Sequence, residues 1–131
     1  MQTDAPSILM VEDDEMLLEF YEAALVPEYE VLTATDLASA LHVLQGQHVD
    51  AVACDLHLGG VSGLELLRWI SENLPGLLAR TAVISGESEP KLGGFDVLVA
   101  GKPIMAEGLH QVFGQLLTRN DAGKSVHGSA A

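Results

Sequence analysis

Short apolar segments recur along the chain, separated by longer stretches in which apolar residues repeat at helical spacing. The first segment, Ser7–Val11, is continuously apolar after its serine rather than alternating. That pattern is typical of a strand buried on both faces of a parallel sheet. Four later segments have similar length and character. The sequence therefore predicts five strands, over residues 7–11, 30–33, 50–54, 81–85 and 95–100.

The stretches between these strands carry the periodicity of amphipathic helices. After the first strand, Met16, Leu17 and Phe20 begin an apolar stripe, and Asp14 is the expected N-cap. Other helix ends have equally clear signals, including a capping box and a terminal glycine. Four helices are predicted. The first spans residues 15–26, and the second spans 37–44, with Asp36 as its cap and Gly46 as its stop. The third begins at the Ser62–Glu65 capping box and ends before Pro75, and the last spans 105–118.

Strands that alternate with helices at this spacing predict an α/β fold. The expected architecture is a five-stranded parallel sheet with right-handed crossovers and helices on both faces. The chain has 131 residues, 48% of them hydrophobic, which is enough for one core but leaves no room for a second domain of ordinary size. We expect the domain to occupy residues 1–119 and residues 120–131 to form a flexible C-terminal tail.

Composition argues against several classes of function. Six Lys and Arg residues stand against 19 Asp and Glu, a net charge of −13, so direct nucleic-acid binding is not expected. No apolar run approaches the roughly 18 residues of a membrane helix, and we expect a cytoplasmic protein without membrane association. Cys54 is the only cysteine and is expected in the core; the five histidines are scattered, without zinc spacing.

Polar residues that suit a common chemistry stand at the ends of four predicted strands. Glu12 and Asp13 follow the first, Asp55 the third, Ser85 ends the fourth, and Lys102 follows the fifth. In a parallel sheet these ends meet at one edge. Like charges 4 Å apart repel by ~4 kcal/mol at an effective dielectric constant of ~20. Because one ammonium cannot neutralise three carboxylates, a divalent cation is expected, and oxygen ligands favour magnesium.

These residues, in this order, resemble the signature of response-regulator receiver domains. The matching elements are Glu12-Asp13, then Asp55 closing an apolar strand, Ser85-Gly86 and Lys102-Pro103. The resemblance spans residues 7–118. It implies a flavodoxin-like fold with strand order 2-1-3-4-5, and it implies a role in two-component phosphorelay signalling.

The resemblance also implies how a magnesium ion is held. Asp13 and Asp55 would be direct ligands, and Glu12 would act through a water molecule. His57 would offer its backbone carbonyl to the metal and its N–H to the phosphoryl group, with its imidazole pointing elsewhere. Lys102 precedes Pro103, where the family often has a cis peptide bond.

In the same way the resemblance assigns the phosphoryl chemistry. Asp55 would be the phosphoacceptor, with a phosphohistidine on a sensor histidine kinase or histidine phosphotransfer domain as donor. The Ser85 hydroxyl, the Gly86 N–H and the Lys102 ammonium would hold the phosphoryl oxygens. Hydrolysis of the acyl phosphate would reset the protein, which is thus a self-phosphorylating receiver rather than an enzyme acting on other substrates.

Three features depart from the family pattern. Val99 stands where receivers commonly place Tyr or Phe, so the usual coupled movement of hydroxyl and aromatic ring is not expected. Only 16 residues separate Ser85 from Lys102, which predicts that the fourth helix is short or absent. The glycines in 59–63 predict a more mobile loop after the acceptor.

Other interpretations fit part of the pattern. Acids at a strand end are often only helix caps, and a one-residue shift would pair Asp13 with Asp14 instead of Glu12. A small magnesium-dependent aspartyl phosphatase also uses a strand-end Asp and a Lys, but should have Asp where His57 stands. A pseudoreceiver that binds proteins without phosphoryl chemistry is favoured by Val99 and the shortened fourth helix.

Overall fold

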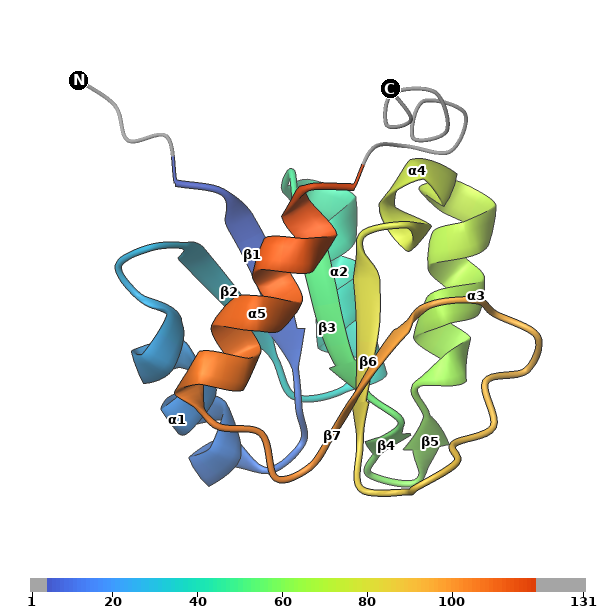
Figure 1. Cartoon of the computed structure of the whole chain (residues 1–131). Helices are drawn as coiled ribbons and strands as arrows, with labels where there is room; N and C mark the ends of the chain where they lie inside the picture. Colours follow the sequence, from blue (N-terminus) through green and yellow to red (C-terminus); the bar gives the residue numbers. More distant parts are fainter. Residues whose placement is uncertain (1–4, 120–131) are drawn as a thin grey trace, which may run out of the picture.

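The computed structural model describes residues 5–119, which form a central parallel sheet covered by helices (Figure 1). The strands lie in the order β2-β1-β3-β6-β7. This is the second, first, third, fourth and fifth strand of the predicted sheet, so the expected topology is confirmed. The strands are β1 (Ser7–Val11), β2 (Glu30–Ala34), β3 (Ala51–Asp55), β6 (Thr81–Ser85) and β7 (Leu98–Gly101).

Helices cover both faces of the sheet because successive strand residues point to opposite sides. Ile8 and Met10 of β1 pack with α1 and α5, whereas Leu9 and Val11 pack with α2 and α3. The helices are α1 (Glu15–Leu25), α2 (Leu37–Gly46), α3 (Leu64–Asn73), the single turn α4 (Pro75–Leu78) and α5 (Ala106–Leu117). Cys54 is 1% exposed, as expected for a core residue.

Two of the predicted helix caps are confirmed. The Asp14 carboxylate accepts hydrogen bonds from the backbone of Met16 and Leu17, at 3.0 and 3.2 Å. Asp36 forms a capping box with Ser39 at the start of α2. Both carboxylates satisfy amide groups that have no partner within their own helix.

The predicted capping box at Ser62 is wrong. A small antiparallel hairpin, β4 (His57–Leu58) and β5 (Val61–Ser62), places Ser62 opposite His57. The N-cap of α3 is Gly63, whose N–H donates to the Leu56 carbonyl at 2.7 Å. Positive φ angles at Gly59 and Gly60 make the hairpin turn. The tertiary contact of Gly63 therefore overrides a plausible local pattern.

No helix forms between β6 and β7, where residues 86–97 are fully described, so the expected shortening is confirmed. The start of the last strand was misplaced: β7 begins at Leu98 rather than Phe95. Phe95 instead closes a turn with Leu92, and both side chains pack against a small cluster with Leu56 and Val83. Of the helices in the described part of the chain, none is long and apolar enough to cross a membrane. The predicted tail, 120–131, lies outside the described residues.

Candidate functional site

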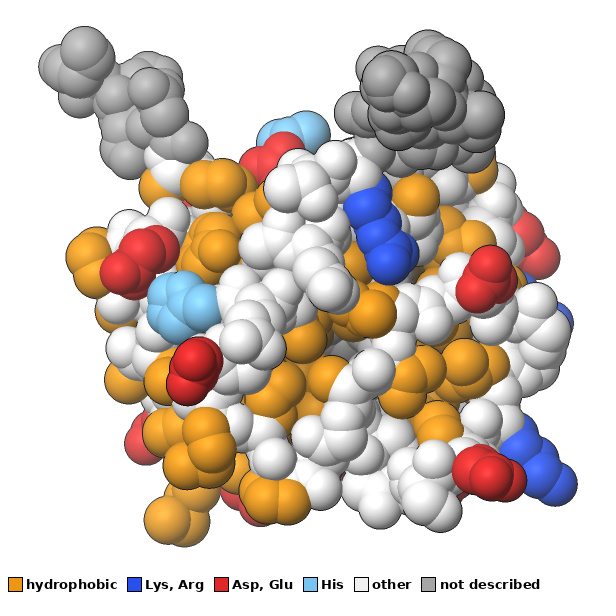
Figure 2. Space-filling view, in the orientation of Figure 1, with side chains coloured by type: hydrophobic (Ala, Val, Ile, Leu, Met, Phe, Trp, Pro, Cys, Tyr) orange, Lys and Arg blue, Asp and Glu red, His pale blue; other side chains and the backbone are white. Residues whose placement is uncertain are grey.

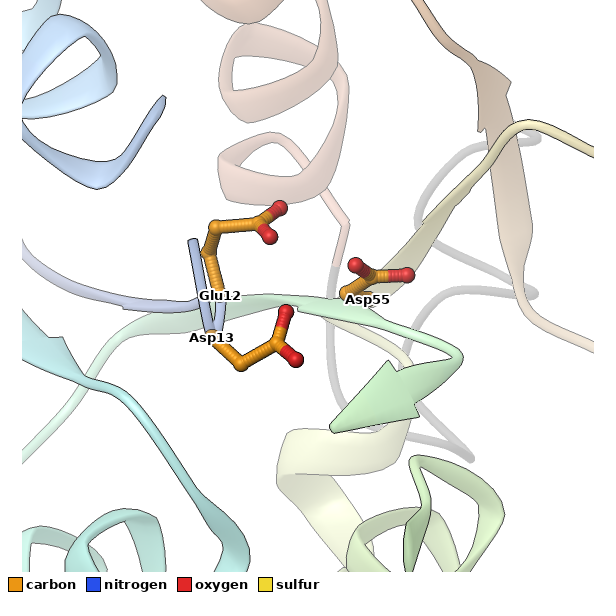
Figure 3. Close-up of side chains that lie close together, drawn as sticks. All are labelled: Glu12, Asp13 and Asp55. Carbon is orange, nitrogen blue, oxygen red and sulfur yellow. The ribbon is translucent and has the colours of Figure 1, made fainter. Parts of the chain in front are cut away.

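Three carboxylates meet at the carboxyl edge of the sheet, as the sequence predicted (Figure 3). Glu12 and Asp13 follow β1, and Asp55 ends the neighbouring strand β3. One oxygen from each side chain lies within 4.8 Å of the others. Glu12 and Asp55 are 2% and 6% exposed, whereas Asp13 is open to solvent. The site is therefore an acidic pocket with one accessible side.

Lys102 reaches into this acidic pocket from the segment after β7. Its Nζ donates to Asp55 Oδ2 at 2.8 Å and to Glu12 Oε1 at 3.0 Å. Burial by itself would lower the pKa of Lys102, but the hydrogen bonds to Asp55 and Glu12 and their charges outweigh it and raise the pKa. The ammonium is thus firmly protonated. The Lys102–Pro103 peptide bond is cis, as the resemblance suggested.

Glu12 has a raised pKa, chiefly because burial penalises its charged form. The Asp14 N–H, which donates to Glu12 Oε2 at 3.1 Å, and the Lys102 ammonium lower that pKa, while the nearby Asp55 charge raises it. The balance favours protonation relative to a carboxylate in water. A further cation in the pocket would reverse this balance.

The structure answers the question of register at the first strand. Asp14 is occupied as the cap of α1, and the carboxylates that lie together are Glu12, Asp13 and Asp55. The alternative that pairs Asp13 with Asp14 is therefore wrong. Asp14 Oδ1 accepts both backbone N–H groups at the start of α1, and Asp14 is not among the three carboxylates that gather in the pocket.

Ser85 lies at the end of β6, beside the acidic pocket, and is 1% exposed. Its Oγ accepts a hydrogen bond from the Glu87 N–H at 3.0 Å, and its carbonyl accepts from the Lys102 N–H at 2.9 Å. Gly86 follows it at the surface. The predicted hydroxyl is therefore in place, with its own proton still able to be donated.

His57 behaves in part as the resemblance implied. Its backbone N–H donates to Asp55 Oδ1 at 3.1 Å, and its exposed imidazole points away, with Nε2 2.9 Å from Glu87 Oε2. Glu87 was not predicted. A signal was available, because Asp55 is in register with Ile84, so residues shortly beyond the two strand ends should meet.

An apolar groove of about 480 Å³ beside the acidic pocket was also missed. It lies between α1 and the segment after β7, and Phe20 and Met105 on its rim are 39% and 63% exposed. Sequence periodicity did not reveal it, because these residues belong to two segments more than 80 positions apart in the chain. Its lining is Leu17, Phe20, Tyr21, Lys102, Pro103, Ile104 and Met105.

Comparison with known proteins agrees with this geometry. The family model described as the response regulator receiver domain matches residues 8–113. The chain belongs to this family. It is thus a receiver domain of the kind used in two-component signalling.

Individual relatives differ in how much of their length is matched. The uncharacterized transcriptional regulatory protein YrkP of Bacillus subtilis is 36% identical over an alignment of 115 residues, and the match covers 83% of this chain but 48% of YrkP. The chain therefore spans about half the length of that relative. The polar-differentiation response regulator DivK of Brucella ovis is 26% identical over 75% of this chain and 85% of its own length.

Solved receiver domains have the same fold. The receiver domain of NtrX from Brucella abortus is 28% identical, with a TM-score of 0.74 over 85% of this chain and 98% of that one. The signal receiver domain of an HD domain-containing protein from Pseudomonas fluorescens Pf-5 is 27% identical, with a TM-score of 0.75 over 86% and 94%.

Proposed function

We propose that the domain accepts a phosphoryl group on Asp55 from a phosphohistidine, carried by a sensor histidine kinase or a histidine phosphotransfer domain. The observation that carries the proposal is the surroundings of the Asp55 carboxylate. Lys102 binds one of its oxygens, the His57 N–H binds the other, and Glu12 and Asp13 complete an acidic pocket around it. A purely structural cap would not need a half-buried ammonium shared by two buried carboxylates.

The donor set fits a magnesium ion, since it consists of carboxylate oxygens with one open side. Asp13 and Asp55 would hold the ion directly, Glu12 through a water molecule, and His57 through its backbone carbonyl. When bound, magnesium would neutralise the carboxylates and stabilise charge on the transferring phosphoryl group. The excess of acids over Lys102 supports this assignment.

In the proposed transfer, a carboxylate oxygen of Asp55 attacks phosphorus while the bond from phosphorus to the donor imidazole breaks. The electron pair of that bond stays on the imidazole nitrogen, and an acyl phosphate forms on Asp55. Lys102 would stabilise charge on one phosphoryl oxygen, and the Ser85 hydroxyl and Gly86 N–H would donate to others. Attack of water on phosphorus would later release phosphate and restore the carboxylate.

The groove beside the acidic pocket offers a place for the donor to dock. It opens next to Lys102, and its rim carries exposed apolar side chains. The exposed acids of α1, Glu15, Glu19 and Glu22, lie on the other side of that helix and do not line the groove. A donor helix with apolar residues next to its phosphohistidine would complement this surface. Such donors act in the cytoplasm, and we place this chain there as part of the proposal.

A mass measurement tests the proposal. The full chain is incubated with magnesium and a small acyl phosphate, and the intact protein is expected to gain one phosphoryl group. Asp55→Asn should gain none, and Asp96→Asn, which removes an exposed acid in the segment before β7, should be modified like the wild type. Unmodified wild-type protein would favour a pseudoreceiver. Release of phosphate from many substrates without a phosphoprotein would favour a phosphatase.

A further inference from the structure

A second groove lies at the edge of the sheet opposite the acidic pocket. It has a volume of about 370 Å³ and lies between the end of α2 and the junction of α3 with α4. Two of its lining residues, Val49 and Arg80, come shortly before β3 and β6, the strands that carry Asp55 and Ser85 at their far ends. We call it the neutral groove. Its other lining residues are Leu44, Gln47, His48 and the segment 73–77.

The walls of the neutral groove are mostly aliphatic. Leu44, Val49 and Leu77 are buried, and Leu74, between α3 and α4, is 36% exposed. Sites for small molecules commonly have volumes of about 300–1,000 Å³ and combine apolar walls with a few polar groups. At about 370 Å³, the neutral groove is at the small end of this range. Its size therefore suits a small ligand.

The two segments that border the neutral groove carry no charge, although 19% of the residues of the chain are charged. Residues 37–49 and 73–79 contain no Asp, Glu, Lys or Arg. On the face that carries α5 and β7, in contrast, acidic and basic side chains are scattered among apolar and uncharged ones (Figure 2). Among the described residues that line the neutral groove, Arg80 alone is one of these four charged types. The groove thus combines aliphatic walls with a single cation.

The Arg80 side chain is held in a defined orientation. Its Nε donates to the Asp50 carbonyl oxygen at 2.7 Å. A guanidinium has five N–H donors in a fixed fork, so it can serve several acceptors and matches the geometry of a carboxylate. The Asp50 carboxylate offsets part of the charge of Arg80, but it accepts from the Ser7 N–H at 2.8 Å, lies 2.8 Å from His48 Nε2, and does not line the groove.

We propose that the neutral groove binds a small aliphatic carboxylic acid, whose carboxylate pairs with Arg80 and whose carbon chain lies against Leu44 and Leu77. Charge complementarity selects an acid over an amine or an alcohol. A chain of net charge −13 repels anions over most of its surface, so a carboxylate is favoured only where a cation stands in neutral surroundings. The groove beside the acidic pocket does not meet this condition, because the carboxylates next to it, Glu12, Asp13 and Asp55, repel an acid.

Two-dimensional NMR of the full chain tests the proposal, with sodium hexanoate as the probe. Hexanoate is expected to shift the backbone amide signals of residues 44–49 and 74–80 in a saturable way. Hexan-1-ol, which has the same carbon chain without the charge, should bind at the same place but more weakly. Neither magnesium nor a phosphodonor is present, so failure of this proposal leaves the proposed phosphorylation of Asp55 untouched.

Substitutions separate the role of the cation from that of the aliphatic walls. Arg80→Gln should weaken the binding of hexanoate about tenfold, as the loss of a charge-assisted hydrogen bond commonly does, and should leave the binding of hexan-1-ol nearly unchanged. Arg68→Gln is the matched control, because Arg68 is an exposed cation on α3 that does not line the groove. This variant should bind hexanoate like the wild type.

A second variant keeps the test valid if Arg80→Gln fails to fold. Leu74→Asp places an anion in the neutral groove and should weaken the binding of hexanoate more than that of hexan-1-ol. The proposal is overturned if hexanoate causes no saturable shifts, or if the shifts centre on Phe20 and Met105 in the other groove. It is also overturned if the alcohol binds the wild type as tightly as the acid, or if Arg68→Gln and Arg80→Gln weaken hexanoate equally.

Discussion

The Lys102 ammonium lies 2.8 Å from Asp55 Oδ2 and 3.0 Å from Glu12 Oε1, so a single cation serves two buried carboxylates. Each carboxylate receives only part of the compensation that a dedicated partner would provide. The pocket therefore retains excess negative charge. This charge would attract a divalent cation, and without a cation it should make the free energy of unfolding depend on pH.

The first prediction concerns Glu12 and pH in the absence of magnesium. Burial raises its pKa above the ordinary value of 4.5, so the folded state binds this proton more tightly than the unfolded state does. The stabilisation from protonated Glu12 is thus fully present below pH 4.5 and is lost as pH rises through the higher folded-state pKa. Glu12→Gln, which stays neutral, should gain stability relative to the wild type across that interval.

Urea unfolding at several pH values, with a chelator present, measures this difference. The gap in unfolding free energy between Glu12→Gln and the wild type should widen from pH 4 toward neutrality, as linkage requires. Glu89→Gln, at an exposed position, controls for the loss of a surface acid. A gap that narrows with rising pH would contradict the assigned direction of the Glu12 shift.

The second prediction concerns Asp13 and magnesium. Asp13 is exposed and would contribute a ligand without being needed for packing. Magnesium at about 100 times its dissociation constant should stabilise the wild type by ~2.7 kcal/mol, because it binds only the folded state. Asp13→Asn should lose most of this gain while keeping nearly the same stability without metal.

The neighbouring residue provides the control for Asp13. Asp14→Asn removes an adjacent carboxylate but keeps a good N-cap for α1, since Asn caps helices about as well as Asp. Its thermal midpoint should therefore rise with magnesium as that of the wild type does. If both variants lost the stabilisation by magnesium equally, the ion would be attracted by the total negative charge of this region and not held by a defined set of ligands.

Much of the pocket could be predicted because its residues sit where apolar strands end. To place Asp55 and Lys102 together, it was enough to locate the strand ends and to know that the carboxyl ends of parallel strands lie at one edge of the sheet. The hairpin before α3 could not be predicted in the same way. Ser62 satisfies a helix-capping pattern locally, but in the structure it pairs with His57 in the hairpin, and the Gly63 N–H donates to the Leu56 carbonyl.

Other features depend on side-by-side packing that periodicity does not encode. Glu87 reaches His57 across two loops, and the sequence separation of 30 residues hides their proximity. The sequence shows that Val99 replaces the aromatic residue common in receivers, and the structure adds that the Val99 side chain is exposed.

The third prediction concerns Gly63, at the start of α3. A Cβ atom there would collide with the Asp55 carbonyl oxygen and approach Leu56 Cα to 3.1 Å. Both atoms belong to the backbone of the segment that positions the acceptor, so they cannot move aside without shifting it. Gly63→Ala should cost about 1–3 kcal/mol of unfolding free energy, as overpacked sites commonly do, and should slow phosphorylation of Asp55 by the small acyl phosphate.

Gly114→Ala is the matched control for this substitution. Gly114 lies within α5, and a Cβ there meets nothing within 4 Å. The variant should gain about 0.5–1 kcal/mol, because alanine loses less backbone entropy than glycine in a helix. The free energy of unfolding in urea should therefore fall for Gly63→Ala and rise for Gly114→Ala, relative to the wild type. The prediction would be contradicted if Gly63→Ala were as stable as the wild type and were phosphorylated at the same rate. The close approach of Gly63 to the backbone of Asp55 and Leu56 would then not be needed to position the Asp55 carboxylate.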